Sequence, residues 1–334
     1  MIRLVIMILG LGSSTRIYFF RESFVAELAI SFLPYFAAGF IVLSVILLII
    51  VLLKKKKGSA KVLALLLIWS AVLGMLYGTE FFSFYSLHPK EQVLSAGLKI
   101  YYANILYTNN DYESLKKQIE ENKADLVILV EFSNEHENAM KGRFQERFPY
   151  VDRNSRSKKL AGNVVFSKYP ITNLSEKYPQ PSGRRRYNYF SVDKGIPLYF
   201  YVIHTSAPVS QYNFQMRNEQ LKKLKTDFLT QSSDRAENAP VVVLGDFNLS
   251  PRSAFYTQFM SGLEGKLKNV SRDYQPHFTR SLRDQKILNV HIDQVFASPQ
   301  VNIGDLGISD LSGSDHHAMM FNVEAISAQT TSLD

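Results

Sequence analysis

The sequence predicts an α/β chain of the mixed α+β kind, preceded by an N-terminal transmembrane helical anchor. Uncharged apolar runs long enough to span a bilayer are confined to the first 85 of the 334 residues. From about Ser86 onward, short strand-like runs alternate with amphipathic helical segments. This alternation is typical of sheet and helix layers packed around one core. No internal repeat is present in the sequence.

The anchor, residues 1–85, is expected to contain two membrane spans. Residues 29–53 are 25 residues without a charge, and at about 1.5 Å per residue they cross a hydrocarbon core of roughly 30 Å. A second apolar run, residues 62–84, ends in an aromatic cluster that is typical of a membrane interface. Buried core helices are the alternative, but helices of this length without a polar face are rare in soluble domains.

The sequence gives less direct information on residues 1–11 and on the orientation of the anchor in the membrane. Residues 1–11 are apolar but too short to cross a bilayer, which leaves open a shortened span, a wrongly chosen start or a half-inserted segment. Lys54–Lys57 and Lys61 lie between the two spans, against only Arg16 and Arg21 before them. The positive-inside rule places that loop in the cytoplasm. We therefore expect a multi-pass protein of the inner, cytoplasmic membrane with an extracytoplasmic catalytic domain.

The net charge of +8 belongs mainly to the anchor. Residues 1–85 carry 8 Lys and Arg against 3 Asp and Glu, whereas the remaining residues carry 30 against 27, a net charge of +3. This charge gives little electrostatic attraction for nucleic acid. The absence of cysteine agrees with an oxidising exterior but equally with other compartments.

The soluble part is read in chain order as a linker (86–97), a catalytic domain (98–325) and a polar tail (326–334). Asp111 is a plausible N-cap for the first helix of this domain. The expected strands are 98–104, 125–131, 163–168, 197–204, 241–248, 290–298 and 318–325, and the expected helices are 111–123, 133–148 and 211–230.

Nearly every one of these strands ends on, or follows, a polar residue that strand packing does not require. Each residue alone is more often a helix cap or a satisfied core side chain. Together they suggest a single site, because strand ends at one edge of a sheet core converge on one cleft. The residues are Asn104, Glu131, His204, Asp246, Asn248, Asp293, Asp315 and His316.

The chemistry of this set narrows the function. Carboxylates and an amide, without cysteine, suit Mg²⁺ or Mn²⁺ better than structural zinc. Carboxylates around such a cation with nearby histidines are what phosphoester hydrolysis needs, since a metal neutralises charge while a base activates water and an acid protonates the leaving oxygen.

Residues 98–323 resemble the endonuclease/exonuclease/phosphatase family, which includes pancreatic-type deoxyribonucleases, apurinic endonucleases, neutral sphingomyelinases and inositol polyphosphate 5-phosphatases. The resemblance follows, in order, LKIYYAN, ILVE, AGNVVFSKYPI, VIHTSAP, VLGDFN, HIDQVF and GSDHHAM. GDFN and SDH are its most specific motifs, and a membrane-anchored bacterial type is suggested by the anchor. The resemblance implies a four-layer sandwich of two packed mixed β-sheets flanked by helices.

The resemblance also implies roles. Glu131 is similar to the main metal-binding carboxylate of the family, with Asn104 beside it and Asp315 as a second metal or water-orienting acid. Asp246 and Asn248 resemble the residues that orient the attacking water and hold the scissile phosphate. His316 resembles the catalytic histidine, which Asp293 would orient and stabilise. His204 resembles a second histidine that protonates the leaving group. Whether Asp246 or His316 removes the proton of water stays open.

Other residues are weighed against simpler roles. Three candidate substrate contacts are His291, on the same strand face as Asp293, Arg186 in the run Arg184–Arg186, and Asn163, for which a satisfied turn is an equal alternative. Alternation along the last strand would aim His317 away from the site. His88, His136 and His277 are expected to be structural.

Three functions follow as alternatives. The first is a membrane-anchored Mg²⁺-dependent phosphodiesterase of the nuclease kind, acting on nucleic acid. The second is a phosphatase or phospholipase C-like hydrolase of lipid-linked or small phosphoesters, which a bilayer tether favours by raising the local concentration. The third is an inactive binding protein, disfavoured because the set of polar residues is intact. No obligate protein partner is inferred.

Overall fold

The computed structural model describes residues 2–53, 57–84, 97–153, 162–175, 187–230, 235–236, 238–271, 278–282 and 285–326. The chain divides into two compact units. The first comprises Met1–Ser86 with Ser250–Thr257, and the second comprises Leu87–Leu249 with Gln258–Asp334.

The described residues up to 84 form the helices α1 (Ile2–Phe19), α2 (Phe24–Ile30), α3 (Leu33–Leu53) and α4 (Lys57–Phe84). Two stretches, Leu33–Leu53 and Ala60–Glu80, are long and apolar enough to cross a membrane. The apolar helix is shorter than the predicted span 29–53, because the chain turns at Ser31 and Phe32 before α3 begins. Pro34 occupies the first turn of α3, where its missing N–H is tolerated. Residues 2–11 are part of the longer α1, whose residues Leu4–Phe19 form a pair with α2 that is bent by 97°.

Polar side chains join the helices of this unit across otherwise apolar surfaces. The Oγ atoms of Ser44 and Ser70 lie 2.8 Å apart, and Trp69 Nε1 donates to Thr15 Oγ1 at 2.9 Å. Hydrogen bonds of this kind between helices stabilise bundles in membranes by about 1 kcal/mol each. The unit thus has its own internal packing, with Leu47 and Leu73 buried between helices.

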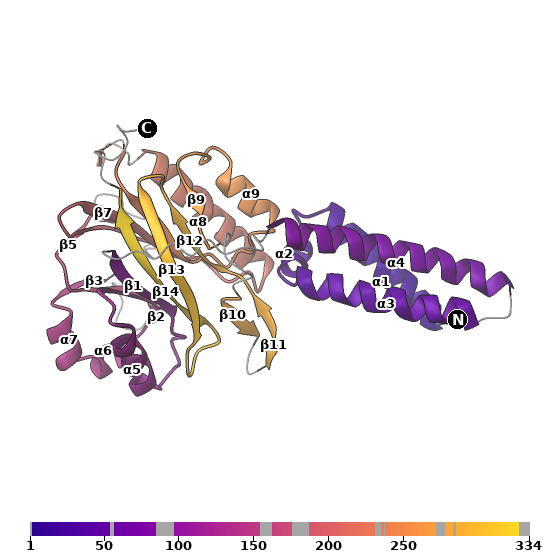
Figure 1. The fold of residues 1–334 in the computed structure, drawn as a ribbon, viewed down its shortest axis with the longest axis horizontal. Coiled ribbons are helices and arrows are strands. Elements are labelled where there is room, and N and C mark those ends of the chain that lie inside the picture. The colour runs from indigo at the N-terminus through magenta and orange to yellow at the C-terminus, as the bar shows by residue number, and fades with distance from the viewer. Residues whose placement is uncertain are drawn as a thin grey trace. The chain divides into compact units, whose positions relative to one another are not determined.

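The second unit is built on two six-stranded mixed sheets, and Figure 1 shows their strands and helices. The first sheet has the order β13-β14-β1-β2-β4-β3, and the second has the order β5-β6-β7-β8-β12-β9. The strands of the first are β1 (Leu98–Asn104), β2 (Leu126–Phe132), β3 (Tyr150–Arg153), β4 (Gly162–Ser167), β13 (Val301–Asp310) and β14 (His317–Ala325). Those of the second are β5 (Ile171–Asn173), β6 (Tyr187–Asp193), β7 (Pro197–His204), β8 (Val241–Asp246), β9 (Lys268–Asn269) and β12 (Asp293–Ala297).

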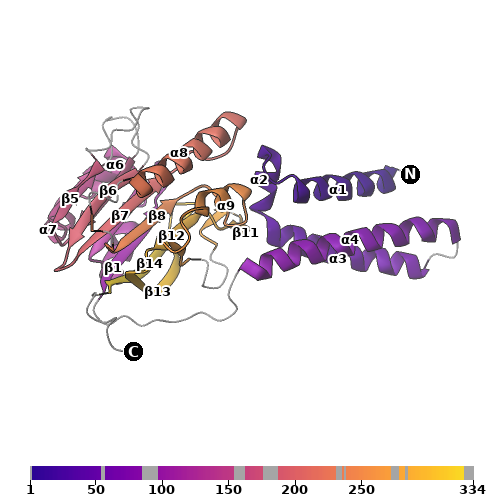
Figure 2. The ribbon, with the colours of Figure 1, turned by 90° about the horizontal axis from the view of Figure 1, so that it is seen from above.

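Four layers result, as the resemblance implied. The faces of the two sheets that meet form the main core, in which Ile128 and Val130 of β2 join Val202 of β7 and Leu244 of β8. The helices α5 (Tyr112–Asn122), α6 (Asn134–Ala139) and α7 (Arg143–Arg147) cover the outer face of the first sheet. The helix α8 (Gln211–Thr230) covers the second, as Figure 2 shows, and α9 (Ala254–Met260) ends with Phe259 against Phe296.

Two details differ from the expectations. The predicted helix 133–148 is divided into α6 and α7, because Gly142 adopts a φ of 85° that ends helical geometry between them. Strands β3, β5, β6, β9 and β13 and the helix α9 were not predicted, and a two-stranded sheet of β10 (Arg280–Leu282) and β11 (Gln285–Val290) adds to the second unit. Asp111 caps α5 as expected, with Oδ1 accepting from Ser114 N at 3.3 Å.

Candidate active site

Strand register places the polar residues side by side. In the second sheet, His204 of β7 pairs with Asp246 of β8, and Asp246 pairs in turn with Asp293 of β12. In the first sheet, Asn104 ends β1, and Glu131 lies near the end of the neighbouring parallel β2. Because the two sheets pack face to face, the ends of these strands meet at one edge of the sandwich.

The carboxylate of Asp246 is the centre of the site. Its Oδ2 accepts a hydrogen bond from Asn104 Nδ2 at 3.1 Å, and it lies 3.8 Å from His204 Nε2 and 3.7 Å from His316 Nε2. Asn104 Nδ2 also donates to Glu131 Oε1 at 3.2 Å. These contacts connect five residues that lie as many as 212 positions apart in the sequence, and each of the five is within hydrogen-bond or ion-pair distance of Asp246 or Asn104.

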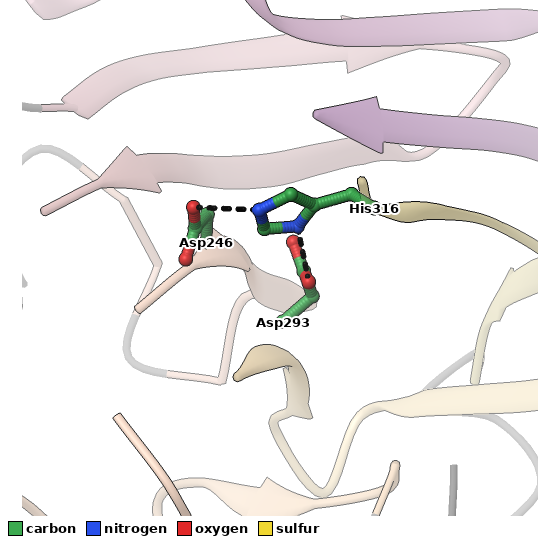
Figure 3. Close-up of side chains that lie close together, drawn as sticks. All are labelled: Asp246, Asp293 and His316. Atoms are coloured by element: carbon green, nitrogen blue, oxygen red, sulfur yellow. Dashed lines mark hydrogen bonds and ion pairs between the residues drawn. The ribbon is translucent and has the colours of Figure 1, made fainter. Parts of the chain in front are cut away.

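His316 is fixed by a buried carboxylate, as Figure 3 shows. Its Nδ1 lies 2.9 Å from Asp293 Oδ2, and its Nε2 faces Asp246. The other oxygen of Asp293 accepts from the hydroxyl of Tyr102 at 2.7 Å. The ring therefore has one orientation, with Nδ1–H held by Asp293 and Nε2 directed into the site, as the logic of a catalytic triad requires.

Burial and charge shift the pKa values in this cluster. Burial, together with the charge of Asp293, raises the pKa of Asp246. Burial alone would raise the pKa of Asp293 as well, but the charge of His316 and hydrogen bonds hold it below its usual value. Burial would lower the pKa of His316, yet the charges of Asp293 and Asp246 raise it to about 9. Asp293 and His316 thus form an ion pair at neutral pH.

The backbone is strained where the site is formed. Leu106, Glu131 and Asn248 have φ values of 59°, 62° and 46°, a region that residues other than glycine rarely adopt. Glu131 Oε2 accepts from Tyr107 N at 3.1 Å, and Asn104 Oδ1 accepts from Leu106 N at 3.1 Å. Asn104 therefore directs its amide nitrogen, rather than its oxygen, at the two carboxylates, and its role as a metal ligand stays a prediction.

The GDFN turn holds Asn248 through backbone atoms. Asn248 N donates to Asp246 Oδ1 at 2.8 Å, and its Nδ2 donates to the Thr205 carbonyl at 3.1 Å. The fully buried Arg217 of α8 donates from Nη1 to the Asn248 carbonyl at 3.0 Å. This turn holds the backbone N–H of Asn248 on Asp246 and its side-chain amide nitrogen on the Thr205 carbonyl, and its role toward a phosphate stays a prediction.

The side chain of Asp315 is bound by an arginine that the sequence analysis did not indicate. Arg280 donates to Asp315 Oδ2 from both Nε and Nη2, at 2.9 and 2.8 Å. Its neighbour His317 lies with Nδ1 2.9 Å from Asp310 Oδ1 and with Nε2 3.0 Å from Ser281 Oγ. Asp315 and His317, the residues on either side of His316, thus bind partners other than Asp246.

A cavity opens beside His316. It has a volume of about 750 Å³ and is lined by Leu106, Ser281 and residues 310–317. Since the catalytic candidate His316 forms part of its wall, this cavity can hold the part of a substrate next to the reacting phosphate.

The remaining predicted contacts are less central. Asn163 is buried and donates to the Val202 carbonyl at 3.3 Å, which is the satisfied structural alternative. His291 is buried in the connection between β11 and β12, outside the strand of Asp293 on which it was expected. Arg184–Arg186, His88 and His277 lie outside the described residues. His136 is buried in a capping box with Ser133, in the structural role that was expected.

The sequence interpretation did not include four residues that hold the site in place, namely Tyr102, Arg217, Thr279 and Arg280. Thr279 Oγ1 accepts from the backbone N–H of both Ile292 and Asp293, at 3.1 and 2.9 Å. Tyr102 lies two residues before Asn104, on the face of β1 toward the sheet interface, so strand alternation could have indicated it. The others lie far from the motifs in sequence.

Comparison with known proteins gives a consistent result. The sequence profile of the Endonuclease/Exonuclease/phosphatase family matches residues 101–316. No curated protein matches the chain by sequence.

Solved structures share the fold at low identity. D. rerio TDP2 in complex with a single-strand DNA product superposes with a TM-score of 0.54 at 17% identity, over 69% of this chain and 100% of that one. Truncated Caenorhabditis elegans TDP2 gives 0.51 at 15% identity, over 68% and 97%. A mutant beta toxin from Staphylococcus aureus with bound magnesium ions gives 0.50 at 17% identity, over 68% and 99%.

Proposed function

Because this chain belongs to the endonuclease/exonuclease/phosphatase family, whose members hydrolyse phosphoester bonds, we propose that it is a membrane-anchored phosphodiesterase that uses a divalent cation and a water molecule. The observation that carries the proposal is the convergence of Asn104, Glu131 and Asp246 with an oriented His316. Carboxylates and an imidazole so arranged can both position a phosphate and move the proton of water.

The oxygen atoms present fit a hard cation. Glu131 Oε1 and Asp246 Oδ2 converge on one amide nitrogen of Asn104, and carboxylate oxygens are the ligands that Mg²⁺ and Mn²⁺ prefer. Asp246, Asp293 and His316 also present potential ligand atoms within 4.8 Å of one another. Asp293 is already engaged by Tyr102 and His316, so we assign it to orientation and give the cation to Glu131 and Asp246. The cation would neutralise charge on a phosphoryl oxygen.

The protein groups supply the proton transfers. Asp246 Oδ2, 3.7 Å from His316 Nε2, would accept the proton of the attacking water. Asp293 holds the positive charge of His316, whose Nε2–H is then directed at Asp246. His204 Nε2, on the other side of Asp246, is placed to protonate the leaving oxygen, and Asn248 would bind the scissile phosphate.

The substrate is either a nucleic acid or a lipid-linked or small phosphoester. The single-strand DNA product bound to D. rerio TDP2 supports the first. The two apolar helices support the second, since a bilayer anchor raises the local concentration of lipid phosphoesters. We give first place to a phosphodiesterase of the nuclease kind on the first of these observations, although the net charge of +3 outside the anchor adds little attraction for nucleic acid.

A substrate panel tests this function. We expect Mg²⁺-dependent release of product from one of four substrates: plasmid DNA, RNA, sphingomyelin-like lipids or phosphoinositides. His316→Ala should reduce the rate on that substrate by about 10²–10⁴-fold. His317→Asn is the matched control and should lose far less, because both ring nitrogens of His317 bind Asp310 and Ser281. Full activity in His316→Ala, or after EDTA treatment, would contradict the proposal.

The orientation is a separate proposal. Lys54–Lys57, between the two candidate spans, and Lys61, at the start of the second one, favour a cytoplasmic loop and an extracytoplasmic catalytic domain. Protease added to intact cells should then cut the catalytic domain. Complete protection, with cutting only after lysis, would reverse the orientation.

A further inference from the structure

A three-residue segment, Thr279–Ser281, lies along the motif that contains the catalytic histidine. Ser281 N donates to the Asp315 carbonyl and His317 N donates to the Thr279 carbonyl, both at 2.8 Å. Arg280 forms an antiparallel bridge with His316 between these two bonds. The backbone of this segment therefore fixes where the Arg280 side chain begins, directly opposite His316.

The guanidinium of Arg280 is committed to Asp315. Nε and Nη2 both donate to Asp315 Oδ2, at 2.9 and 2.8 Å, and the two side chains are 34% and 21% exposed. Burial alone would lower the pKa of Arg280, but the charge and hydrogen bonds of Asp315, with smaller contributions from the charges of Asp246 and Asp293, raise it. Arginine stays charged at any working pH and has five N–H donors, of which this pair uses two.

This pairing bears on how many cations the site can hold. Arg280 occupies Asp315 Oδ2 with both of these N–H donors. A divalent cation on the Asp315 carboxylate would have to compete with, and lie next to, a permanent positive charge. Glu131 and Asp246 converge elsewhere, on Asn104.

We propose that Arg280 replaces a second divalent cation in this protein, so that its guanidinium neutralises Asp315 and binds a phosphoryl oxygen of the substrate beside His316. The site then holds one divalent cation, at Glu131 and Asp246. This inference rests on the proposed function, because it assigns a role in the same phosphodiesterase site. A planar guanidinium suits the task, since it binds phosphate oxygens through paired N–H groups.

Cation binding tests the proposal without relying on activity. Calorimetry and Mn²⁺ electron paramagnetic resonance on the full-length protein in detergent should show one Mn²⁺ per wild-type chain. The Asp315→Asn variant should still bind one, and Glu131→Gln should bind none. Arg280→Gln should gain a second, weaker Mn²⁺ that the double variant Arg280→Gln/Asp315→Asn loses. Circular dichroism on each variant checks that it is folded.

Two results would overturn the proposal in distinguishable ways. Two Mn²⁺ ions in the wild type, reduced to one by Asp315→Asn, would show that Asp315 binds a cation despite Arg280 and would leave the proposed function intact. No Mn²⁺ bound to the folded wild type would remove the proposed metal site and this inference together.

Kinetics on bis(p-nitrophenyl) phosphate give a second readout. Arg280→Gln should lower kcat/KM by about 10²-fold, the size of effect expected when one donor to a developing charge is removed. Raising the Mn²⁺ concentration should restore part of this loss in Arg280→Gln but not in the double variant. The control is Arg153→Gln on the strand β3. This variant breaks the ion pair between Arg153 and Glu137 and should leave the rate unchanged. Equal losses in both arginine variants would refute a specific role for Arg280.

Discussion

At the scale of single residues, the site depends on how Asp293 is held. This carboxylate is fully buried and is bound by His316 and Tyr102, while the backbone N–H of Asp293 donates to Thr279 Oγ1. A buried charge is tolerated only when it is paired and hydrogen-bonded. Each of these partners therefore contributes to the position of His316, although only His316 faces the reacting groups.

The hydroxyl of Tyr102 provides the first prediction. Tyr102→Phe leaves one oxygen of Asp293 without its donor, so we expect kcat to fall by about tenfold with little change in KM, and the free energy of unfolding to fall by about 1–3 kcal/mol. Steady-state kinetics and denaturant unfolding measure both. Tyr101→Phe is the control: this neighbour is also buried, but its hydroxyl donates to Gln118 on the other face of β1. A loss of kcat in Tyr101→Phe as large as in Tyr102→Phe would argue against a positioning role.

The second prediction concerns pH. The pKa of His316 is raised to about 9 in the folded protein, against about 6.5 in an unfolded chain. Its charge therefore stabilises the fold fully below pH 6.5, and this contribution is lost as the pH rises through 9. In protein treated with EDTA, the free energy of unfolding should fall between pH 7 and 9.5, measured by denaturant titration. The slope should be absent in His316→Asn, and an equal slope in both proteins would exclude His316 as its source.

At the scale of elements, the GDFN motif is a backbone requirement as much as a chemical one. Gly245 pairs with Ile203 of β7 and with Gln294 of β12, so it lies in the middle of the second sheet. Its φ is 141°, and a Cβ at this position would lie 2.0 Å from the Ile203 carbonyl oxygen. Glycine is thus needed for β7 and β8 to approach, and their approach brings His204 beside Asp246.

This gives the third prediction. Gly245→Ala should lower the free energy of unfolding by at least about 3 kcal/mol, or prevent folding, because the added methyl group meets backbone in a strained conformation. Gly262→Ala is the control, since Gly262 also has a positive φ of 79° but has open space around a Cβ. It should cost only about 1 kcal/mol of conformational strain. Thermal or denaturant unfolding compares them, and similar losses would show that the contact with Ile203 is unimportant.

At the scale of the whole molecule, two units with different surfaces share one chain. In the first unit, the helices α3 and α4 expose large apolar side chains such as Ile41, Val45 and Leu65. In the second unit, apolar residues are gathered between the sheets and under the helices. Exposed apolar surface of this extent is unstable in water and stable in a bilayer.

The fourth prediction follows from this difference. The full-length protein should stay in the membrane fraction after alkaline carbonate extraction, because the two apolar stretches Leu33–Leu53 and Ala60–Glu80 are long enough to span it. Fractionation followed by immunoblotting measures this. Release of the intact chain by carbonate would mean that these helices do not cross a bilayer.

Much of the fold was accessible from the sequence because its signals are local. The apolar runs, the strand ends at Asn104 and Glu131, and the GDFN and SDH motifs each lie within a few residues. The division of helix 133–148 at Gly142 was missed because a single glycine inside a helical pattern does not by itself end a helix. The strand β13 was missed because Gly304 and Gly307 interrupt its pattern.

The sequence by itself determined the class of fold, the apolar helices near the N-terminus and the chemical identity of the groups that meet at Asp246. Only the tertiary structure decided which groups hold those residues in place. Tyr102 reaches Asp293 across 191 positions, and Arg280 reaches Asp315 from a strand with no recognisable motif. The physical reason is that periodicity and turn chemistry act between near neighbours in sequence. Hydrogen bonds between packed sheets depend on register and side-chain direction, which exist only once the chain has folded.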